Sequence, residues 1–305
     1  MDNSITIEQL EKLRLEAKKL DTLSLVLAVI SLPIYIWLFY MAEQGEEALT
    51  VIFILKLITV SFVVSLGTFA LLWCLIARKA NKRFKDSYKS KYVVETISSI
   101  SGFNDLKYYP KDGFSWDDIR NAAVVGCGDK KYFESEDLLF GIYDNVRFKI
   151  SDVTSKKYVP RGKKLRTEII FDGQVMCFFQ FDEMKKSNGH IQIFQKELLS
   201  DISGWKAEHE IHTENEDFNS RFNVYTSDEH NAYYILTPQR IEKIMDFEKN
   251  INEQISISFY DDRMFVAVKR WSMFDPTTDK PVLEQVKCIA DDVEYILKAK
   301  EILVD

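Results

Sequence analysis

Two long uncharged segments interrupt an otherwise polar pattern in the first quarter of the chain. They run from Thr22 to Ala42 and from Leu57 to Ile76. A helix needs about 20 apolar residues to cross the hydrocarbon core of a bilayer, and each segment has that length. The sequence therefore predicts a hairpin of two membrane-spanning helices. A cleaved signal peptide is not expected, because a mixed acidic and basic helix precedes a full-length span.

The charges beside these spans predict their orientation. The connection between them, "EQGEE" at residues 43–47, has three acids and no base. Seven lysines and arginines lie between Arg78 and Lys91, directly after the second span. Basic flanks are retained in the cytoplasm, so we expect both termini to be cytoplasmic. The same basic residues can attract anionic lipid, although the topology alone also requires them.

A shorter amphipathic helix is expected before the first span. Thr6 and Gln9 stand three residues apart, which is the spacing of a capping box. The apolar positions that follow recur at helical spacing on one face, and they are Leu10, Leu13, Ala17 and Leu20. This face can lie on the membrane, bind a partner, or pack on the helix that follows the second span. The pattern leaves these three alternatives open.

The second span is expected to continue as a helix to about Ser101. Gly102, Pro110 and Gly113 then break the helical pattern, and Ser115 is placed to cap a short helix. We interpret this stretch as a linker that leads into a folded unit. The chain is accordingly divided into a cytosolic amphipathic helix at 1–21, a transmembrane hairpin at 22–77, a juxtamembrane helix and linker at 78–122, and a cytosolic α+β domain at 123–305.

From about Phe133 apolar and polar residues alternate, which is the period of a β-strand. Three pairs of turn residues between such runs predict hairpins, and they are Asp144-Asn145, Asp172-Gly173 and Asp261-Asp262. Between the first two pairs, the segment "SKKYVPRGKKLR" at residues 155–166 concentrates basic residues. It has the composition of an exposed loop. A phosphate-binding role is the alternative for this loop.

Helical patterns return toward the end of the chain. Pro238 follows Thr237 and is expected to start an amphipathic helix, and a last helix is expected from about Val282 to Ala299. Runs of strands with a few covering helices differ from strict alternation of strand and helix. They predict an α+β fold with a mainly antiparallel sheet.

The aromatic-rich segment "EDFNSRFNVYTSDEHNAYYILTP", residues 216–238, joins these parts. Phe222 and Val224 alternate with polar neighbours as in a strand, residues 227–231 have the composition of a turn, and residues 232–238 are expected to form a second strand. The aromatics are therefore interpreted as architecture. The candidate binding residues, for a partner that meets the exposed turn, are Asp228, Tyr225, Tyr233 and Arg221.

His209 and His212 are the candidate metal ligands. A His-x-x-His pair beside several acids offers two imidazoles and a carboxylate. Residues three apart face opposite sides of a strand, however, so the pair is useful only in a helix or a loop. The spacing is a weak signal, and no cofactor is expected.

Cys127 is the candidate nucleophile. It lies between two glycines in "VVGCGD", where a tight turn can expose a thiol, although no histidine partner can be assigned to it. An ordinary buried cysteine is the alternative. The four cysteines have no C-x-x-C spacing, which indicates reduced thiols in the cytoplasm rather than a zinc cluster.

Composition excludes two further classes. The net charge of −7 disfavours a nucleic-acid-binding surface, because phosphate neutralisation needs concentrated Lys and Arg. Neither glycine-rich phosphate-loop motif is present, so nucleotide hydrolysis by those routes is not expected.

The order of motifs resembles a bacterial family of membrane proteins known only as a domain of unknown function, DUF3137. The matching segments lie between Lys107 and Pro276, and they include "YYPKDGFSWDDI", "ESEDLLFGIYDNVRFKISDV", "IIFDGQVMCFFQFD", "EDFNSRFNVYTSDEHNAYYILTP", "ISISFYDDRMFVAV" and "MFDP". The resemblance implies paired membrane helices ahead of a cytosolic domain. It implies no activity.

These observations favour a multi-pass protein of the bacterial inner membrane. Its cytosolic domain is expected to be an interaction or sensor module that binds protein or lipid partners, including a second copy of the chain. The alternative is a membrane-tethered enzyme or effector that uses Cys127, or a metal at His209 and His212.

Overall fold

The computed structural model describes residues 6–42, 51–161, 164–179, 187–196, 207, 209–251, 253–270, 272 and 274–303. The chain divides into two compact units. The helical unit comprises residues 1–91 and 275–286, and the sheet unit comprises residues 92–274 and 287–305. Each is described by itself.

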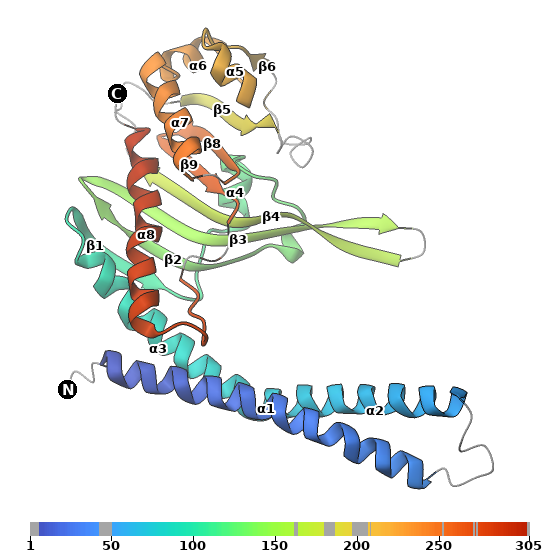
Figure 1. The fold of residues 1–305 in the computed structure, drawn as a ribbon. Helices are drawn as coiled ribbons and strands as arrows, with labels where there is room; N and C mark the ends of the chain where they lie inside the picture. Colours follow the sequence, from blue (N-terminus) through green and yellow to red (C-terminus); the bar gives the residue numbers. More distant parts are fainter. Residues whose placement is uncertain are drawn as a thin grey trace. The chain divides into compact units, whose positions relative to one another are not determined.

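The helical unit contains the two predicted apolar helices. Its elements are α1 (Ile7–Ala42), α2 (Val51–Leu72), a single π turn (Trp73–Ala77) and most of α3 (Arg78–Ser98) (Figure 1). The stretches Ile7–Met41 and Ile54–Ser98 are long and apolar enough to cross a membrane. The capping box at Thr6 and Gln9 is confirmed, since each backbone N–H donates to the other residue's side chain at 3.0 and 3.3 Å.

Small residues line the contact between α1 and α2. Ser24, Ala28 and Ser65 are buried, and the Ser65 hydroxyl donates to the Ala28 carbonyl oxygen at 2.6 Å. Farther along the same contact, the Tyr35 hydroxyl lies 3.0 Å from the Thr68 hydroxyl. Small side chains let helix backbones approach closely, and hydroxyl groups add bonds across the contact. These polar groups are thus turned inward, toward the seam between the two helices.

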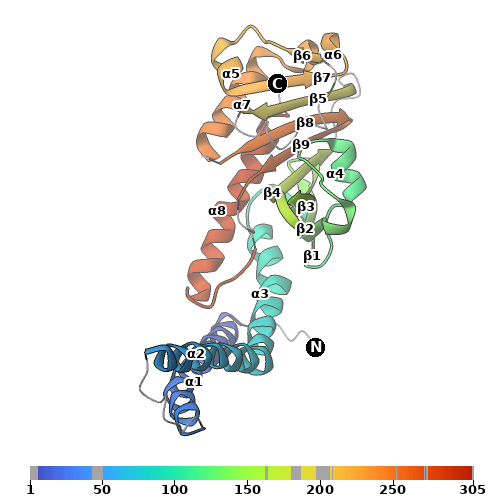
Figure 2. The ribbon, with the colours of Figure 1, turned by 90° about the vertical axis from the view of Figure 1, so that its right-hand side faces the viewer.

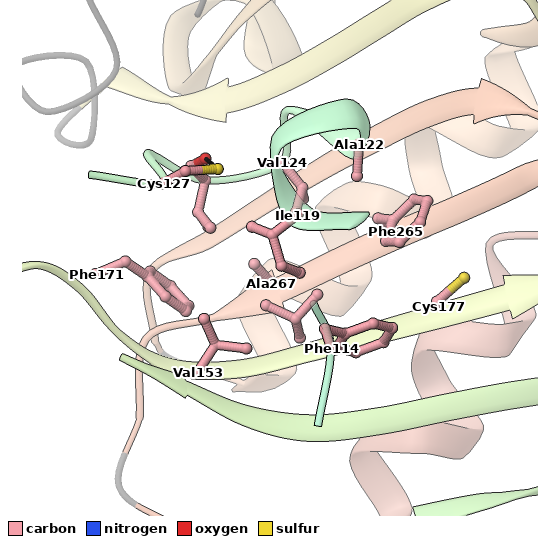
Figure 3. Close-up of a cluster of buried hydrophobic side chains, with 12 residues drawn as sticks. Phe114, Ile119, Ala122, Val124, Cys127, Val153, Phe171, Cys177, Phe265 and Ala267 are labelled. Carbon is pink, nitrogen blue, oxygen red and sulfur yellow. Dashed lines mark hydrogen bonds between the residues drawn. The ribbon is translucent and has the colours of Figure 1, made fainter. Parts of the chain in front are cut away.

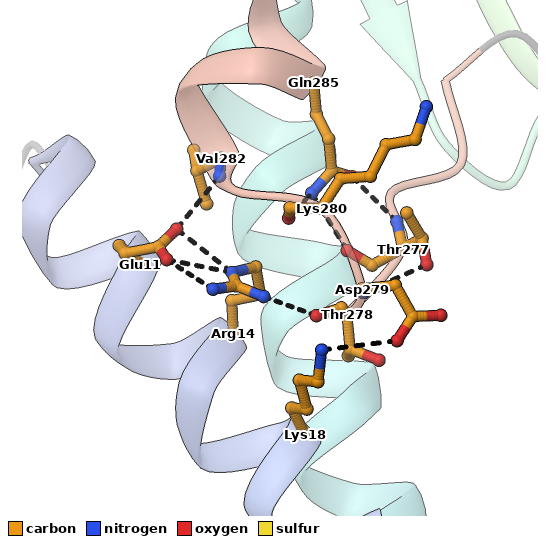
Figure 4. Close-up of polar contacts among 9 residues, drawn as sticks. All are labelled: Glu11, Arg14, Lys18, Thr277, Thr278, Asp279, Lys280, Val282 and Gln285. Carbon is orange, nitrogen blue, oxygen red and sulfur yellow. Dashed lines mark hydrogen bonds and ion pairs between the residues drawn. The ribbon is translucent and has the colours of Figure 1, made fainter.

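A segment from near the end of the chain is bound to the first helix within the helical unit. The Glu11 carboxylate accepts a hydrogen bond from the Val282 backbone N–H at 2.9 Å, and Arg14 donates to the Thr278 carbonyl oxygen at 2.5 Å (Figure 4). Val282 begins α8 (Val282–Glu301), so Glu11 supplies an acceptor to the first turn of a helix distant in sequence. Arg14 also binds Glu11 at 2.5 Å, which links the two contacts.

The sheet unit is built on one nine-stranded antiparallel sheet in the order β1-β2-β3-β4-β9-β8-β5-β7-β6 (Figure 2). In that order the strands are Phe103–Tyr109, Glu134–Tyr143, Val146–Arg161, Lys164–Phe179, Arg263–Val268, Ile255–Asp261, Ser187–Gln195, Phe222–Thr226 and His209–Ile211. The predicted α+β class with an antiparallel sheet is confirmed.

Short helices and two long ones cover this sheet. The elements are α4 (Trp116–Ala122), a 3-10 turn (Lys130–Tyr132), α5 (Glu216–Arg221), α6 (Glu229–Ile235) and α7 (Pro238–Ile251), with the later part of α8. In Figure 2, α7 and α8 lie on one face of the sheet and α4 lies on the other. Ser115 caps α4 as predicted, since the Asp118 backbone N–H donates to its hydroxyl at 3.0 Å.

A hydrophobic core joins α4 to the middle of the sheet. Ile119 and Ala122 of α4 pack with Val175 of β4 and Phe265 of β9 (Figure 3). The carbonyl groups at the end of α4 are buried, and strand side chains supply their donors: Ser258 binds the Ala122 oxygen at 2.5 Å and Gln192 binds the Ala123 oxygen at 2.9 Å. The buried Ser258 and Gln192 side chains therefore have a structural role.

Two of the three predicted hairpin turns are confirmed. Asp144 and Asn145 both have positive φ, 46° and 66°, as the tightest two-residue hairpin requires. The hairpin at Asp261-Asp262 joins β8 to β9. The prediction of a turn at Asp172-Gly173 is wrong, because β4 runs through these two residues without a break. A Cβ at Gly173 would lie 2.3 Å from the Val268 carbonyl oxygen, so glycine here permits the close approach of β9 rather than a turn.

Other local predictions are also corrected. The basic segment at 155–166 is not a loop: its described residues continue β3 and β4 as paired strands up to Arg161↔Lys164. Residues 229–235 form α6, where a turn and a strand were expected. β1 lies within the stretch interpreted as a linker and pairs with β2.

Candidate functional site

Asp228, the first candidate binding residue, caps a helix. Its carboxylate accepts a hydrogen bond from the Asn231 backbone N–H at 3.1 Å, which closes the first turn of α6. Its own N–H donates to the Thr226 hydroxyl at 3.0 Å, so the chain is held where β7 ends. An N-cap aspartate stabilises a helix by about 1 kcal/mol, which gives this residue a structural role.

The two candidate tyrosines lie in different environments. Tyr225 is buried in β7, and its hydroxyl accepts a hydrogen bond from the Asn223 amide at 3.3 Å. Tyr233 is exposed on α6, and its hydroxyl donates to the His212 carbonyl oxygen at 3.2 Å. Its neighbour Tyr234 is equally exposed. Of the two candidate tyrosines, Tyr233 is therefore the exposed one.

Arg221 stands at the opposite end of β7 from Asp228. Its guanidinium binds Asp217 at 2.9 Å and Glu248 at 3.2 Å, and these carboxylates, Asp217 first, raise its pKa. It lines a surface hollow of about 660 Å³ together with Glu248 and Gln195. A five-residue strand at about 3.3 Å per residue separates this hollow from the α6 surface. The four candidates are therefore not assembled into one site.

The two candidate metal ligands are both exposed. His209 begins β6, and its Nδ1 lies 3.9 Å from the Glu229 carboxylate. His212 follows the strand. Within the part of the chain that the structure describes, no group of three or more His, Cys, Asp and Glu side chains is placed to hold a metal ion.

Cys127 is buried in the core shown in Figure 3. Its thiol lies 3.8 Å from the Val125 carbonyl oxygen. Burial raises the pKa of this thiol to about 12, and nearby Arg120 offsets that shift only in part. Because the thiolate is the nucleophile, this environment is that of an inert cysteine and does not support the enzyme alternative at Cys127.

We expect the low reactivity of the buried Cys127 thiol to appear in a labelling experiment. At pH 8 a pKa near 12 lowers the thiolate fraction about a thousandfold below that of a free cysteine, whose pKa is about 8.5. Iodoacetamide should therefore modify the exposed Cys288 and leave Cys127 and Cys177 unmodified in the folded protein. Peptide mass spectrometry measures the three sites, and adding urea should remove the difference. Rapid modification of Cys127 in the folded chain would contradict this assignment.

A surface hollow of about 620 Å³ on the sheet was not predicted from the sequence; four acids line it, together with Lys111 and Arg270. Glu134, Thr154 and Asp172 are direct neighbours across β2, β3 and β4, and the Thr154 hydroxyl donates to Asp172 at 2.8 Å. Glu136 and Asp152 also line the hollow and pair across β2 and β3. The signal was the alternation of acids on these strands, and the assignment of Asp172 to a turn concealed it.

Comparisons with known proteins identify one region of the chain. Residues 169–303 match the family model described as "Protein of unknown function (DUF3137)". No curated protein and no solved structure matches the chain. The match begins inside β4 and ends after α8, and so starts later than the motifs that first indicated the resemblance. Residues 169–303 thus carry a DUF3137 domain, a domain of unknown function.

Proposed function

We propose that this chain is a multi-pass protein of the bacterial inner membrane, in which α1 and α2 anchor the sheet unit at the cytoplasmic face. There the sheet unit acts as an interaction or sensor module for protein or lipid partners. The observation that carries the proposal is the apolar exterior of the hairpin. Only 11% and 17% of the most apolar stretches of the two candidate spans are buried.

A core helix of a soluble protein buries most of its apolar surface, whereas these helices turn theirs outward. Large exposed apolar side chains follow both helices, among them Val29, Ile34, Leu55, Val63 and Leu66. Contiguous apolar patches of this extent are rare on soluble monomers and mark contact with a membrane or another protein. Combined with spans of about 20 residues, they favour a bilayer.

The inner end of the hairpin has the composition of a membrane boundary. The Trp73 indole N–H donates to the Asp21 carboxylate at 3.0 Å, and the Asn81 amide binds the same carboxylate at 2.8 Å. Tryptophan is enriched at the interface between hydrocarbon and water. The basic run from Arg78 begins one turn farther on, which supports a cytoplasmic position for this end.

The topology can be tested with cysteine reporters. The first reporter is Gln44→Cys in a chain that also carries Cys74→Ser and Cys288→Ser. We expect it to react with a membrane-impermeant maleimide in cells whose outer membrane has been opened and whose inner membrane is intact. The native Cys288, in a chain that carries only Cys74→Ser, should react only after the inner membrane is permeabilised, because basic flanks hold that side in the cytoplasm.

An alkaline carbonate wash provides the independent control, since it removes peripheral proteins and should leave this chain in the membrane pellet. Equal labelling of both reporters from outside would overturn the orientation. Release of the chain by carbonate would overturn the anchor itself.

A further inference from the structure

The strands β3 and β4 extend beyond the rest of the sheet as a two-stranded ribbon (Figure 1). β2 pairs with β3 only as far as Glu134↔Thr154, and β9 pairs with β4 only from Gln174↔Val268 onward. Residues 155–171, here called the basic arm, pair across the ribbon from Ser155↔Phe171 to Arg161↔Lys164. Among the described strands, none other pairs with the arm.

The root of the basic arm is held by the segment before β2. The Ser155 hydroxyl donates to the Gly126 carbonyl oxygen at 2.5 Å, and the Asp129 carboxylate accepts from the Tyr158 backbone N–H at 2.8 Å. Gly128 has φ 55°, and a Cβ there would lie 2.3 Å from the Lys156 carbonyl oxygen. These contacts fix the direction in which the arm leaves the sheet, so it is a built projection rather than a solvated loop.

The charge of the arm opposes that of the whole chain. Residues 155–171 contain six lysines and arginines and one acid, Glu168, in a protein whose net charge is −7. Lys156 is paired with Glu134 at 3.5 Å at the root of the arm. Farther out, Arg166 is exposed. A surface of this kind attracts an anionic partner over roughly a Debye length, about 8 Å at physiological salt.

The arm also carries apolar side chains on one face. Tyr158 pairs with Thr167, and Lys156 pairs with Ile169, so these residues share one side of the ribbon. Tyr158 is 42% exposed and Ile169 is 58% exposed. Lys157, Val159 and Arg166 belong to the opposite side, as does Glu168, which pairs with Lys157. A projection with exposed apolar groups on one face and cations on the other offers both kinds of group that bind the headgroup region of a bilayer, where tyrosine is enriched.

We propose that the basic arm binds anionic phospholipid headgroups. The proposal rests on the proposed function, because the anchoring helices of the same chain would hold the arm at high effective concentration near a bilayer. A second copy fits the arm less well. Edge strands that carry lysine and proline resist pairing with another strand, and Pro160 lacks the N–H donor that pairing needs. Two arms of like charge also repel.

The test uses the full-length chain with a polarity-sensitive dye on Thr167→Cys, in a background of Cys74→Ser and Cys288→Ser. The labelled chain is reconstituted into nanodiscs of phosphatidylcholine, without or with phosphatidylglycerol. We expect a blue shift of the dye emission only in discs that contain phosphatidylglycerol. The shift should disappear at 1 M salt, where the Debye length is about 3 Å.

Charge reversal separates the arm from general electrostatics. The double variant Lys157→Glu with Arg166→Glu should weaken the response of the dye to phosphatidylglycerol at least about tenfold. Each lysine or arginine near an anionic surface contributes about 1 kcal/mol of attraction, and the variant removes two of them. The matched control, Lys107→Glu with Lys249→Glu, changes the net charge equally at two exposed positions outside the arm and should leave the response unchanged.

Three results would overturn the proposal: no shift in either disc, an equal shift in both discs, or a shift in detergent that grows with protein concentration, which would indicate a second copy. If the chain enters both discs and the dye does not respond, membrane anchoring by α1 and α2 is supported and lipid binding by the basic arm is excluded. If the chain enters neither disc, the anchor fails. The same dye is then measured with added vesicles of the two compositions, which tests the arm directly.

Discussion

Replacing Arg240 by leucine is expected to lower the free energy of unfolding of the sheet unit by about 3–5 kcal/mol. Arg240 is 1% exposed, and its guanidinium donates to the Ile302 carbonyl oxygen at 3.0 Å and to the Leu303 oxygen at 3.4 Å. It also donates to the Ile235 oxygen. These carbonyls end α8 and α6, where helices leave acceptors without backbone donors. Leucine fills much of the volume and supplies no donor.

Thermal and urea unfolding of the full chain, followed by the signal of the sheet unit, measure this effect. Arg240→Lys should be less destabilising, since one ammonium can serve part of the acceptor set. Lys249→Leu, on an exposed position of the same helix, should change stability by no more than about 0.5 kcal/mol. Equal losses for Arg240→Leu and Lys249→Leu would exclude the carbonyl contacts as the cause.

Replacing Arg14 by leucine is expected to release the segment 275–286 from α1. Arg14 is buried, and it binds both Glu11 and the Thr278 carbonyl oxygen, while Glu11 binds the Val282 N–H. Its loss removes the charged donor of the Glu11 carboxylate and the guanidinium donor of the Thr278 carbonyl group, at a cost of about 2–4 kcal/mol. Hydrogen exchange of residues 275–286 should accelerate by at least about thirtyfold at the lower bound of that cost.

The matched control is Lys18→Leu, because Lys18 forms an exposed pair with Asp279 at 3.5 Å on the same helix and segment. Exposed pairs contribute about 0–1 kcal/mol, so this variant should exchange nearly as the natural chain does. If Arg14→Leu and Lys18→Leu accelerate exchange equally, the buried network does not hold the segment.

The same segment has a defined response to acid. Burial acts to raise the pKa of Asp275, but Lys89 at 2.6 Å and Lys85 outweigh burial and hold this pKa below its ordinary value of 3.8. A depressed carboxyl pKa adds stability at pH values above 3.8, and that stability is lost as the pH falls further. Exchange of residues 275–286 should therefore keep the same protection from pH 8 to about pH 5.

Local turn chemistry predicted much of the sheet and failed where a tertiary contact decided the conformation. Asp144-Asn145 and Asp261-Asp262 lie between alternating runs, and both are turns. Asp172-Gly173 is also a typical turn dipeptide, yet glycine is needed at position 173 because β9 approaches its backbone. A single sequence does not contain the position of β9, so the signature alone could not distinguish a turn from a strand.

The segment at 229–235 shows a second limit. Tyr233, Tyr234 and Ile235 favour a strand by propensity, whereas the Asp228 cap and the burial of Ala232 and Ile235 favour a helix, which is what forms. The predicted site followed from the strand assignment, which placed Asp228 and Tyr233 at one exposed turn. Once the helix forms, Asp228 is partly buried as its cap, whereas Tyr233 stays exposed.

The order of strands in the sheet has a practical consequence for isolating the DUF3137 region. The family match begins at residue 169, inside β4, whereas β1, β2 and β3 precede it and lie on the far side of β4 from β9. A fragment cut at that residue would remove β3 from the remaining two thirds of β4 and expose the N–H and C=O groups of Val175 and Cys177 along a new edge. Bare edges of this kind recruit other chains and lead to aggregation. The natural boundary for producing the sheet unit therefore lies before Phe103.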